Sequence, residues 1–366
     1  MKINKTLTAL IAGASLGLSG QAFAAGTTAG TPISNTVSLS FTVGSDSITA
    51  TPDTAVFNVD TKVNLSLDWQ DGALVTGTAG VEVAFELQIS NTGNDVQNFK
   101  FSSGEFTNGN DVTAGNADSD EFGTLFTFYA DTNSSGGYNT GDVALTSNTI
   151  SGLAVDTPTT VFAVVTVPTD ALDLAVIGAE LMAQAVDGSG DPLDESLPGD
   201  DKNTNLLANY VVFAEATSDS ALTLAPATTR DGAYVVSAGT DVQAANLVIE
   251  KTIAITNDGL TSSAHAASPK AIPGATVQYT ITVENRGRVA ASLVRVVDDL
   301  TANANLDASA VDVIGDLAIT GGGNAVTSNA MAASLVDVTF TSLAAKDATD
   351  GSGPDFVQIV FEATIQ

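Results

Sequence analysis

Cysteine is absent from this chain of 366 residues, and histidine occurs only once. Without cysteine the chain can form neither a disulfide bond nor a thiolate nucleophile. Zinc sites need several Cys or His ligands, so the composition also argues against zinc. His265 stands in a run of Ser and Ala, whereas a Ser-His-Asp arrangement requires a histidine that its neighbours hold in position. These shortages predict that the chain is not an enzyme.

Positive charge is also scarce, because 12 Lys and Arg stand against 42 Asp and Glu and the net charge is −30. A surface of this sign repels phosphate backbones, so we expect no nucleic-acid partner. It suits a solvated exterior, or one that gathers divalent cations. The many acids leave paired carboxylates for glycoside hydrolysis as an open alternative, although one Trp and five Tyr offer few platforms for sugars.

Long apolar runs are missing apart from one near the start. Lys2 and Lys5 precede an apolar stretch at 7–18, and Ala22-Phe23-Ala24 follows as a small-x-small cleavage pattern. The stretch is shorter than the roughly 20 residues that span a bilayer. We predict a signal peptide over 1–24, with an uncleaved amphipathic helix as the alternative. The protein is then expected at the cell surface or outside the cell, without a membrane span.

What the chain has in abundance is alternation of apolar and polar residues, which is typical of half-buried strands. Gly, Asn, Asp and Ser clusters separate these runs, as turns require. One stretch, 171–186, could be helical, and we predict a strand for its second half, 179–186. The fold class predicted is all-β. The main runs lie at 37–43, 63–69, 81–89, 160–167, 247–255, 277–283, 336–340 and 357–365.

An internal repeat divides the chain, because residues 80–93 align without gaps on 274–287. Each copy is an alternating strand that ends in Asn-x-Gly, where a turn can use the positive φ that glycine tolerates. We predict two tandem immunoglobulin-like β-sandwiches; chance similarity of amphipathic strands is the alternative. The expected boundaries are an N-terminal sandwich with an N-terminal hairpin at 25–216, a linker at 217–243 and a C-terminal domain at 244–366.

Residues 271–287 carry a family resemblance. They contain a Pro-Gly turn, a strand rich in Thr, Val and Tyr, and the closing Asn-x-Gly, and an apolar strand then leads to Asp298. This pattern resembles the bacterial "conserved repeat domain", catalogued as domain of unknown function number eleven. Residues 25–36 are similar to the openings of exported proteins with this repeat. The resemblance implies an immunoglobulin-like sandwich in a secreted or cell-surface protein, and no catalytic residues. Arg286-Gly287-Arg288 departs from the pattern and is expected to change only a surface loop.

The segment 131–142 is the best candidate for a metal site. Its Asp-x-Asn-x-Ser-Gly spacing, with an acid at the twelfth place, supplies several oxygens from one loop, and calcium takes six to eight oxygen ligands. The flanking runs look like strands, so the loop would join a hairpin and would not form an EF-hand. The alternative is a polar loop without an ion. The predicted calcium ligands are Asp131, Asn133, Ser135, Gly137, Asn139 and Asp142.

Two other acidic groups are weaker candidates for calcium by the same ligand argument. A solvated acidic loop is the alternative for each of them. The first group consists of Asp187, Asp191, Asp194, Glu195, Asp200 and Asp201, and the second of Asp118, Asp120 and Glu121.

Together these features favour an extracellular structural or surface-assembly protein, such as a subunit of a filament or surface layer. Its partners would be further copies of itself or other cell-surface components. In a sharper version, 31–43 is a donor strand that adds to the open sheet edge of a neighbouring subunit; the alternative is that it pairs within its own domain. The second functional hypothesis is a calcium-dependent adhesin or carbohydrate-binding module.

Overall fold

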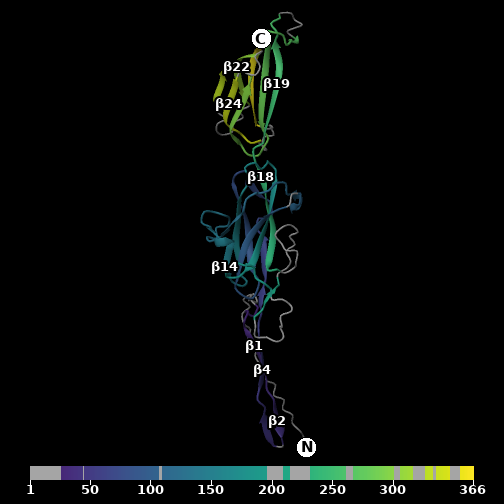
Figure 1. Cartoon of the computed structure of the whole chain (residues 1–366), viewed down its shortest axis with the longest axis vertical. Coiled ribbons are helices and arrows are strands. Elements are labelled where there is room, and N and C mark those ends of the chain that lie inside the picture. The colour runs from purple at the N-terminus through teal and green to yellow at the C-terminus, as the bar shows by residue number, and fades with distance from the viewer. Residues whose placement is uncertain are drawn as a thin grey trace, which may run out of the picture.

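The structure is a computed structural model, and almost all of its ordered elements are strands, which confirms the all-β prediction (Figure 1). It describes residues 26–43, 45–106, 109–195, 209–214, 231–260, 267–300, 306–315, 326–332, 335–346 and 355–366. The predicted signal peptide, His265, Asp200 and Asp201 lie outside these residues. No helix in the described part is long and apolar enough to cross a membrane.

The strands follow one another with one short 3-10 helix, η1, among them. In chain order they are β1 (Pro32–Val37), β2 (Ser40–Val43), β3 (Asp46–Thr49), β4 (Asp53–Asn58), β5 (Thr61–Val63), β6 (Leu65–Trp69), β7 (Val75–Thr78), β8 (Glu82–Asn91), β9 (Gln97–Glu105), β10 (Asp111–Thr113), β11 (Asn116–Ala117), β12 (Thr127–Ala130), β13 (Val143–Ala144), η1 (Thr146–Asn148), β14 (Thr149–Leu153), β15 (Pro158–Thr166), β16 (Val176–Val186), β17 (Val211–Phe213), β18 (Ala233–Gln243), β19 (Leu247–Asn257), β20 (Thr276–Asn285), β21 (Ala291–Asp299), β22 (Leu306–Gly315), β23 (Val326–Ala332), β24 (Leu335–Leu343) and β25 (Asp355–Ile365).

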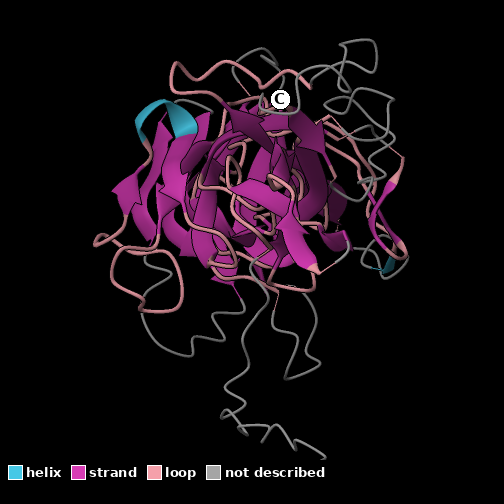
Figure 2. Cartoon of the chain, turned by 90° about the horizontal axis from the view of Figure 1, so that it is seen from below, coloured by secondary structure: helices cyan, strands magenta, loops and turns pink. Residues whose placement is uncertain are grey.

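Three parts lie in line along the molecule. A β-ribbon formed by β1 to β4, which we call the arm, projects from one end of a first sandwich, and a second sandwich continues from the other end (Figure 1). Seen along the long axis, the strands of these parts overlap (Figure 2). The arm and the C-terminal sandwich are therefore separated by the whole length of the N-terminal sandwich.

The N-terminal sandwich contains two five-stranded sheets, with the orders β13-β12-β15-β8-β6 and β14-β9-β16-β18-β7. Its core follows from the alternation in the sequence, because Phe85, Leu87 and Ile89 of β8 share one face and all are buried. Phe101 of β9, in the second sheet, and Phe128 of β12, in the same sheet as β8, belong to the same core. β16 covers the predicted strand at 179–186, so that expectation is confirmed.

The C-terminal sandwich is smaller. A four-stranded sheet, β19-β20-β25-β22, faces a three-stranded sheet, β21-β24-β23, in the part that the structure describes. Ile281 of β20, Val338 of β24 and Ile359 of β25 are among its buried core residues. The core therefore lies mainly between β20, β25, β21 and β24.

The linker predicted at 217–243 is wrong over Ala233–Gln243, which is β18. This strand pairs with β16 and β7 inside the N-terminal sandwich, so it belongs to that core. Glycine is typical of linkers, but here Gly239 lies with Ala238 in a tightly packed layer, where short side chains fit between the sheets. Only Ala244, Ala245 and Asn246 separate β18 from β19. Residues 217–230 lie outside the described part.

Candidate assembly site

The arm is an exposed two-stranded ribbon. β1 pairs with β4 and β2 pairs with β3, both antiparallel, and all but one of their residues are exposed. The N-terminal hairpin was predicted, but as a part of the sandwich, and the single strand expected at 37–43 is divided between β1 and β2. The reason is a register change: Val37 lies opposite Asp53, whereas Ala50 N donates to Leu39 O at 2.8 Å, which leaves an extra residue on the returning leg.

The two faces of the arm differ in chemistry. Residues directly opposite one another in an antiparallel pair point to the same face. Ile33 lies opposite Phe57, and Phe41 lies opposite Ile48, whereas Thr42 lies opposite Ser47 on the other face. One face, which we call the apolar face, therefore carries most of the large apolar residues of the ribbon, together with Asn35, Asp46 and Asp53. Its large apolar residues are 37% to 67% exposed: Ile33, Val37, Leu39, Phe41, Val43, Ile48 and Phe57.

Such an arm is incomplete as a folding unit. An isolated two-stranded hairpin is at best marginally stable in water, because one of its faces has nothing to pack against. A group of large exposed apolar residues on one face generally marks a surface that another molecule covers. The arm is thus the strongest candidate for an assembly surface among the described residues.

The repeated Asn-x-Gly corner organises both sandwiches in the same way. In the first copy the Asn91 amide donates to Asp95 O and Leu153 O, both at 2.9 Å, and its oxygen accepts Gly93 N. In the second copy the Asn285 amide donates to the carbonyls of Val289, Leu343 and Ala344, and its oxygen accepts the N–H groups of Gly287 and Asn246. The aligned positions therefore occupy equivalent places in the two sandwiches.

The reason given for the glycines in this motif is wrong. Neither Gly93 nor Gly287 has a positive φ. Instead, a Cβ on Gly287 would lie 2.2 Å from Ala244 O, and one on Gly93 would lie 2.4 Å from Lys62 O. Glycine is needed because the backbone of the preceding segment passes too close for any side chain.

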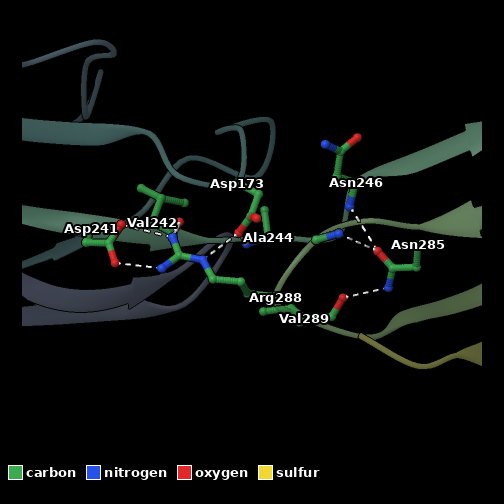
Figure 3. Close-up of polar contacts among 9 residues, drawn as sticks. Asp173, Asp241, Val242, Ala244, Asn246, Asn285, Arg288 and Val289 are labelled. Carbon is green, nitrogen blue, oxygen red and sulfur yellow. Dashed lines mark hydrogen bonds and ion pairs between the residues drawn. The ribbon is translucent and has the colours of Figure 1, made fainter. Parts of the chain in front are cut away.

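A guanidinium joins the two sandwiches, as Figure 3 shows. Arg288 donates to both carboxylate oxygens of Asp241, at 2.7 and 2.9 Å, and to Asp173 at 3.0 Å. It also donates to the carbonyl of Val242. The two carboxylates raise the pKa of Arg288 further above its usual range. Arg288 is thus an interdomain contact, and the expectation of an ordinary surface loop is wrong for this residue.

Asn94 occupies the place in the first copy that Arg288 has in the second. Each lies three residues after the corner asparagine. The Asn94 amide donates to Asp60 O at 2.9 Å and to Thr27 O at 3.2 Å, so it holds the base of the arm. The same corner therefore contacts the preceding part of the chain in both copies. The contact is made by the neutral Asn94 where that part is the arm, and by the charged Arg288 where it is the N-terminal sandwich.

The six predicted calcium ligands lie in one exposed loop between β12 and β13. Their oxygens are largely engaged with the loop itself: Asp131 Oδ1 accepts Ser134 N at 2.7 Å, and Asp142 Oδ2 accepts Asn139 N at 2.8 Å. Asn133 donates to Asn139 at 2.9 Å. Asp142 Oδ1 is buried and has no hydrogen-bond partner among the described residues. Calcium binding here stays a prediction.

Tyr138 anchors this loop to the sandwich. Its ring lies 4.9 Å from that of Tyr129 and 6.0 Å from that of Phe162, measured between centroids. Burial, with a hydrogen bond to Tyr129, raises the pKa of Tyr138 to about 12. The phenol therefore stays neutral, and the loop is held by packing.

The two weaker acidic groups differ in their surroundings. Asp187 forms an exposed turn in which its Oδ1 accepts Ser189 N and Asp191 N, and these bonds lower its pKa. Asp118 is only 3% exposed, and burial raises its pKa to about 6. In the described part, no three His, Cys, Asp or Glu side chains gather closely enough to hold a metal ion by themselves.

No family model matches the chain, and no curated protein matches it. Among solved structures, a family 123 glycoside hydrolase from Clostridium perfringens matches with a TM-score of 0.24 and 10% identity over 50% of this chain and 27% of the hydrolase. The full-length RrgB pilus protein from Streptococcus pneumoniae matches with a TM-score of 0.20 and 15% identity over 83% of this chain and 44% of the pilus protein. A chaperone–tip adhesin complex of CFA/I fimbriae matches with a TM-score of 0.20 and 7% identity, over 66% of this chain and 76% of that chain.

The chain thus spans less than half the length of the hydrolase and of the pilus protein. TM-scores this low do not define a shared arrangement of strands. The chain's own geometry is what bears on its function.

Proposed function

We propose that this chain is an exported structural subunit of an extracellular or cell-surface assembly, and that the arm joins one subunit to the next. The supporting observation is the apolar face of the arm, which its own sandwich leaves uncovered. Residues such as Val37 and Phe41 are 67% and 46% exposed. Burial of apolar surface is the main driving force for association, at about 25 cal/mol per Å².

Substitution of the apolar face tests this proposal. The chain from Ala25 onward should form species larger than a monomer in sedimentation velocity, and elongated particles in electron micrographs. Val37→Glu/Phe41→Glu should remain monomeric, because two carboxylates would have to be buried with the arm. Leu125→Glu, at a residue that is 88% exposed on the N-terminal sandwich, is the control and should assemble normally. A wild-type chain that stays monomeric at all concentrations would refute the proposal.

A further inference from the structure

In the part that the structure describes, the C-terminal sandwich contains fewer strands than the N-terminal sandwich. The pairings correspond one to one through most of the fold: Leu65 lies opposite Asn91 as Leu247 lies opposite Asn285, and Gln97 opposite Leu153 as Ala291 opposite Leu343. β6, β8, β9, β14 and β15 are therefore equivalent to β19, β20, β21, β24 and β25. In the described residues, nothing beside β21 corresponds to β16, β18 and β7.

The consequence is seen on the inner side of β19. In the N-terminal sandwich, Leu65 and Leu67 of β6 are 2% and 0% exposed, since β18 packs across β6. The equivalent Leu247 and Ile249 are 44% and 64% exposed. Ile249 lies opposite Val283, which is buried, so it points toward the core side of its sheet and not to the outside.

This uncovered region has a definite shape. One wall is the inner side of β19, with Leu247, Ile249 and Ile253, which is 61% exposed. We call these three residues the acceptor face. The other wall is β21, which among the described residues pairs with a strand on one side only, and Lys251 reaches across to Asp298 of β21 at 2.6 Å. The Lys251 ammonium also lies over the Tyr279 ring, 4.6 Å from its centre, so this side chain covers part of the aromatic surface between the two walls.

We infer that the arm of a second copy of this chain packs on this uncovered region and takes the places there that β16 and β18 have in the N-terminal sandwich. The inference rests on the proposed function and names the surface that receives the arm. Both the β16–β18 pair and the arm are antiparallel ribbons, and their lengths agree. At about 3.3 Å per residue, each leg of the arm extends about 40 Å and an 11-residue strand such as β16 extends about 36 Å.

Chemistry and charge also fit. The large apolar residues of the arm share a face that also carries Asn35, Asp46 and Asp53, and this face would lie against Leu247 and Ile249; the other face, with Thr36 and Thr42, would remain toward solvent as the outer side of a sheet does. Residues 26–58 contain no Lys or Arg, so nothing in the arm repels Lys251. The edge of β21 would gain main-chain hydrogen bonds from the added strand.

The arm must come from another molecule. In its own chain the N-terminal sandwich separates the arm from the uncovered region (Figure 1). β21 starts at the junction, where Val289 N donates to Ala244 O at 3.3 Å, and runs toward the free end of the molecule. An arm that enters from this free end sends its first leg toward the junction, antiparallel to β21, as β16 lies against β9. The contact is head-to-tail, so it propagates into a chain of subunits.

A mixing experiment with two variants tests the inference on the chain from Ala25 onward. Ile249→Glu charges the acceptor face and leaves the arm intact, whereas Val37→Glu/Phe41→Glu charges the arm and leaves the acceptor face intact. Each variant alone should sediment as a monomer. Their mixture should give a 1:1 heterodimer and nothing longer, because only one productive contact exists between them.

Three results separate the possible failures. If the wild type never assembles, the proposed function fails. If the arm variant is monomeric but Ile249→Glu assembles like the wild type, the arm works through another surface and the inference about the acceptor face is wrong. If both variants are monomeric but the mixture gives no heterodimer, the inference is also wrong. Leu125→Glu, expected to assemble normally, and an unchanged circular-dichroism spectrum of Ile249→Glu exclude effects of charge or misfolding.

Discussion

At the scale of single residues, buried polar groups decide where this fold is rigid. Asn285 is fully buried and links its own corner to Asn246 and Ala344, in two neighbouring segments, and Asn91 links the other corner to Leu153. A buried amide left without partners costs about 1–3 kcal/mol per group, so full satisfaction makes these corners firm anchors. Asp118 is an exception, because its Oδ2 is buried without a hydrogen-bond partner among the described residues.

Asp118 makes stability depend on pH in a predictable direction. Its pKa is raised from 3.8 to about 6, chiefly because burial disfavours the charged form. The folded state therefore retains a proton that the unfolded state loses, and the contribution to stability is lost as pH rises from about 4 through 6. Asp118→Asn keeps an oxygen for Gly178 N and cannot ionise.

We expect Asp118→Asn to match the wild type in melting temperature at pH 4 and to exceed it at pH 7. Thermal denaturation followed by circular dichroism across this range measures the difference. Asp46→Asn, at an exposed acid near the tip of the arm, is the control and should show no such trend. A constant difference at every pH would contradict the assignment.

Calcium, if it binds the loop at 131–142, should stabilise the folded protein. Saturation at about a hundred times Kd adds about 2.7 kcal/mol, which is a shift of several degrees in melting temperature. Asp142→Asn should remove the shift, because Oδ1 of Asp142 is the loop oxygen without a partner. Asp191→Asn, in the other acidic turn, should leave it intact. Identical melting curves in calcium and in chelator would reject the site.

At the scale of elements, the corner after β8 contacts the arm, and the corner after β20 contacts the N-terminal sandwich. Asn94 holds the base of the arm with neutral hydrogen bonds, whereas Arg288 holds the N-terminal sandwich with a planar fork on Asp241. Guanidinium suits this role since it binds both carboxylate oxygens at once. The stiffness of the junction therefore depends on one side chain more than on the short connection at 244–246.

Arg288→Ala should loosen the two sandwiches without unfolding either. We expect the contact between the sandwiches to lose about 1–3 kcal/mol of stabilising free energy, because hydrogen bonds to charged groups are removed and Asp173 stays buried without its guanidinium. Small-angle X-ray scattering should show a broader distribution of shapes for Arg288→Ala than for the wild type. Arg288→Lys should give a distribution between those of the wild type and Arg288→Ala.

The matched control is Arg295→Ala, which removes an exposed pair with Asp337 inside one sheet. Exposed ion pairs contribute little, so this variant should keep the scattering profile of the wild type. If Arg288→Ala also left the profile unchanged, the junction would be held by the connection at 244–246 alone.

At the scale of the whole molecule, the main consequence of the fold is that its two ends differ. The arm leaves at one end and the acceptor face opens toward the other, so the two complementary surfaces cannot meet within one chain (Figure 1). The assembly proposed here is then a filament with a direction, whose order follows from a single repeated contact. The strongly acidic exterior, with a net charge of −30, would oppose nonspecific association of such chains.

The sequence by itself determined the all-β class, the repeat and the apolar faces of the strands, since alternation with period two depends only on neighbouring residues. It left open whether 31–43 adds to a neighbouring subunit or pairs within its own chain, and in the structure this segment pairs with residues 46–58 of the same chain. Its errors fell where a residue's role depends on distant segments: β18 resembled a linker, and Arg288 resembled a surface residue. Only the tertiary structure decided that Leu67 is covered while its counterpart Ile249 is not, because that depends on which strands from elsewhere in the chain lie above them.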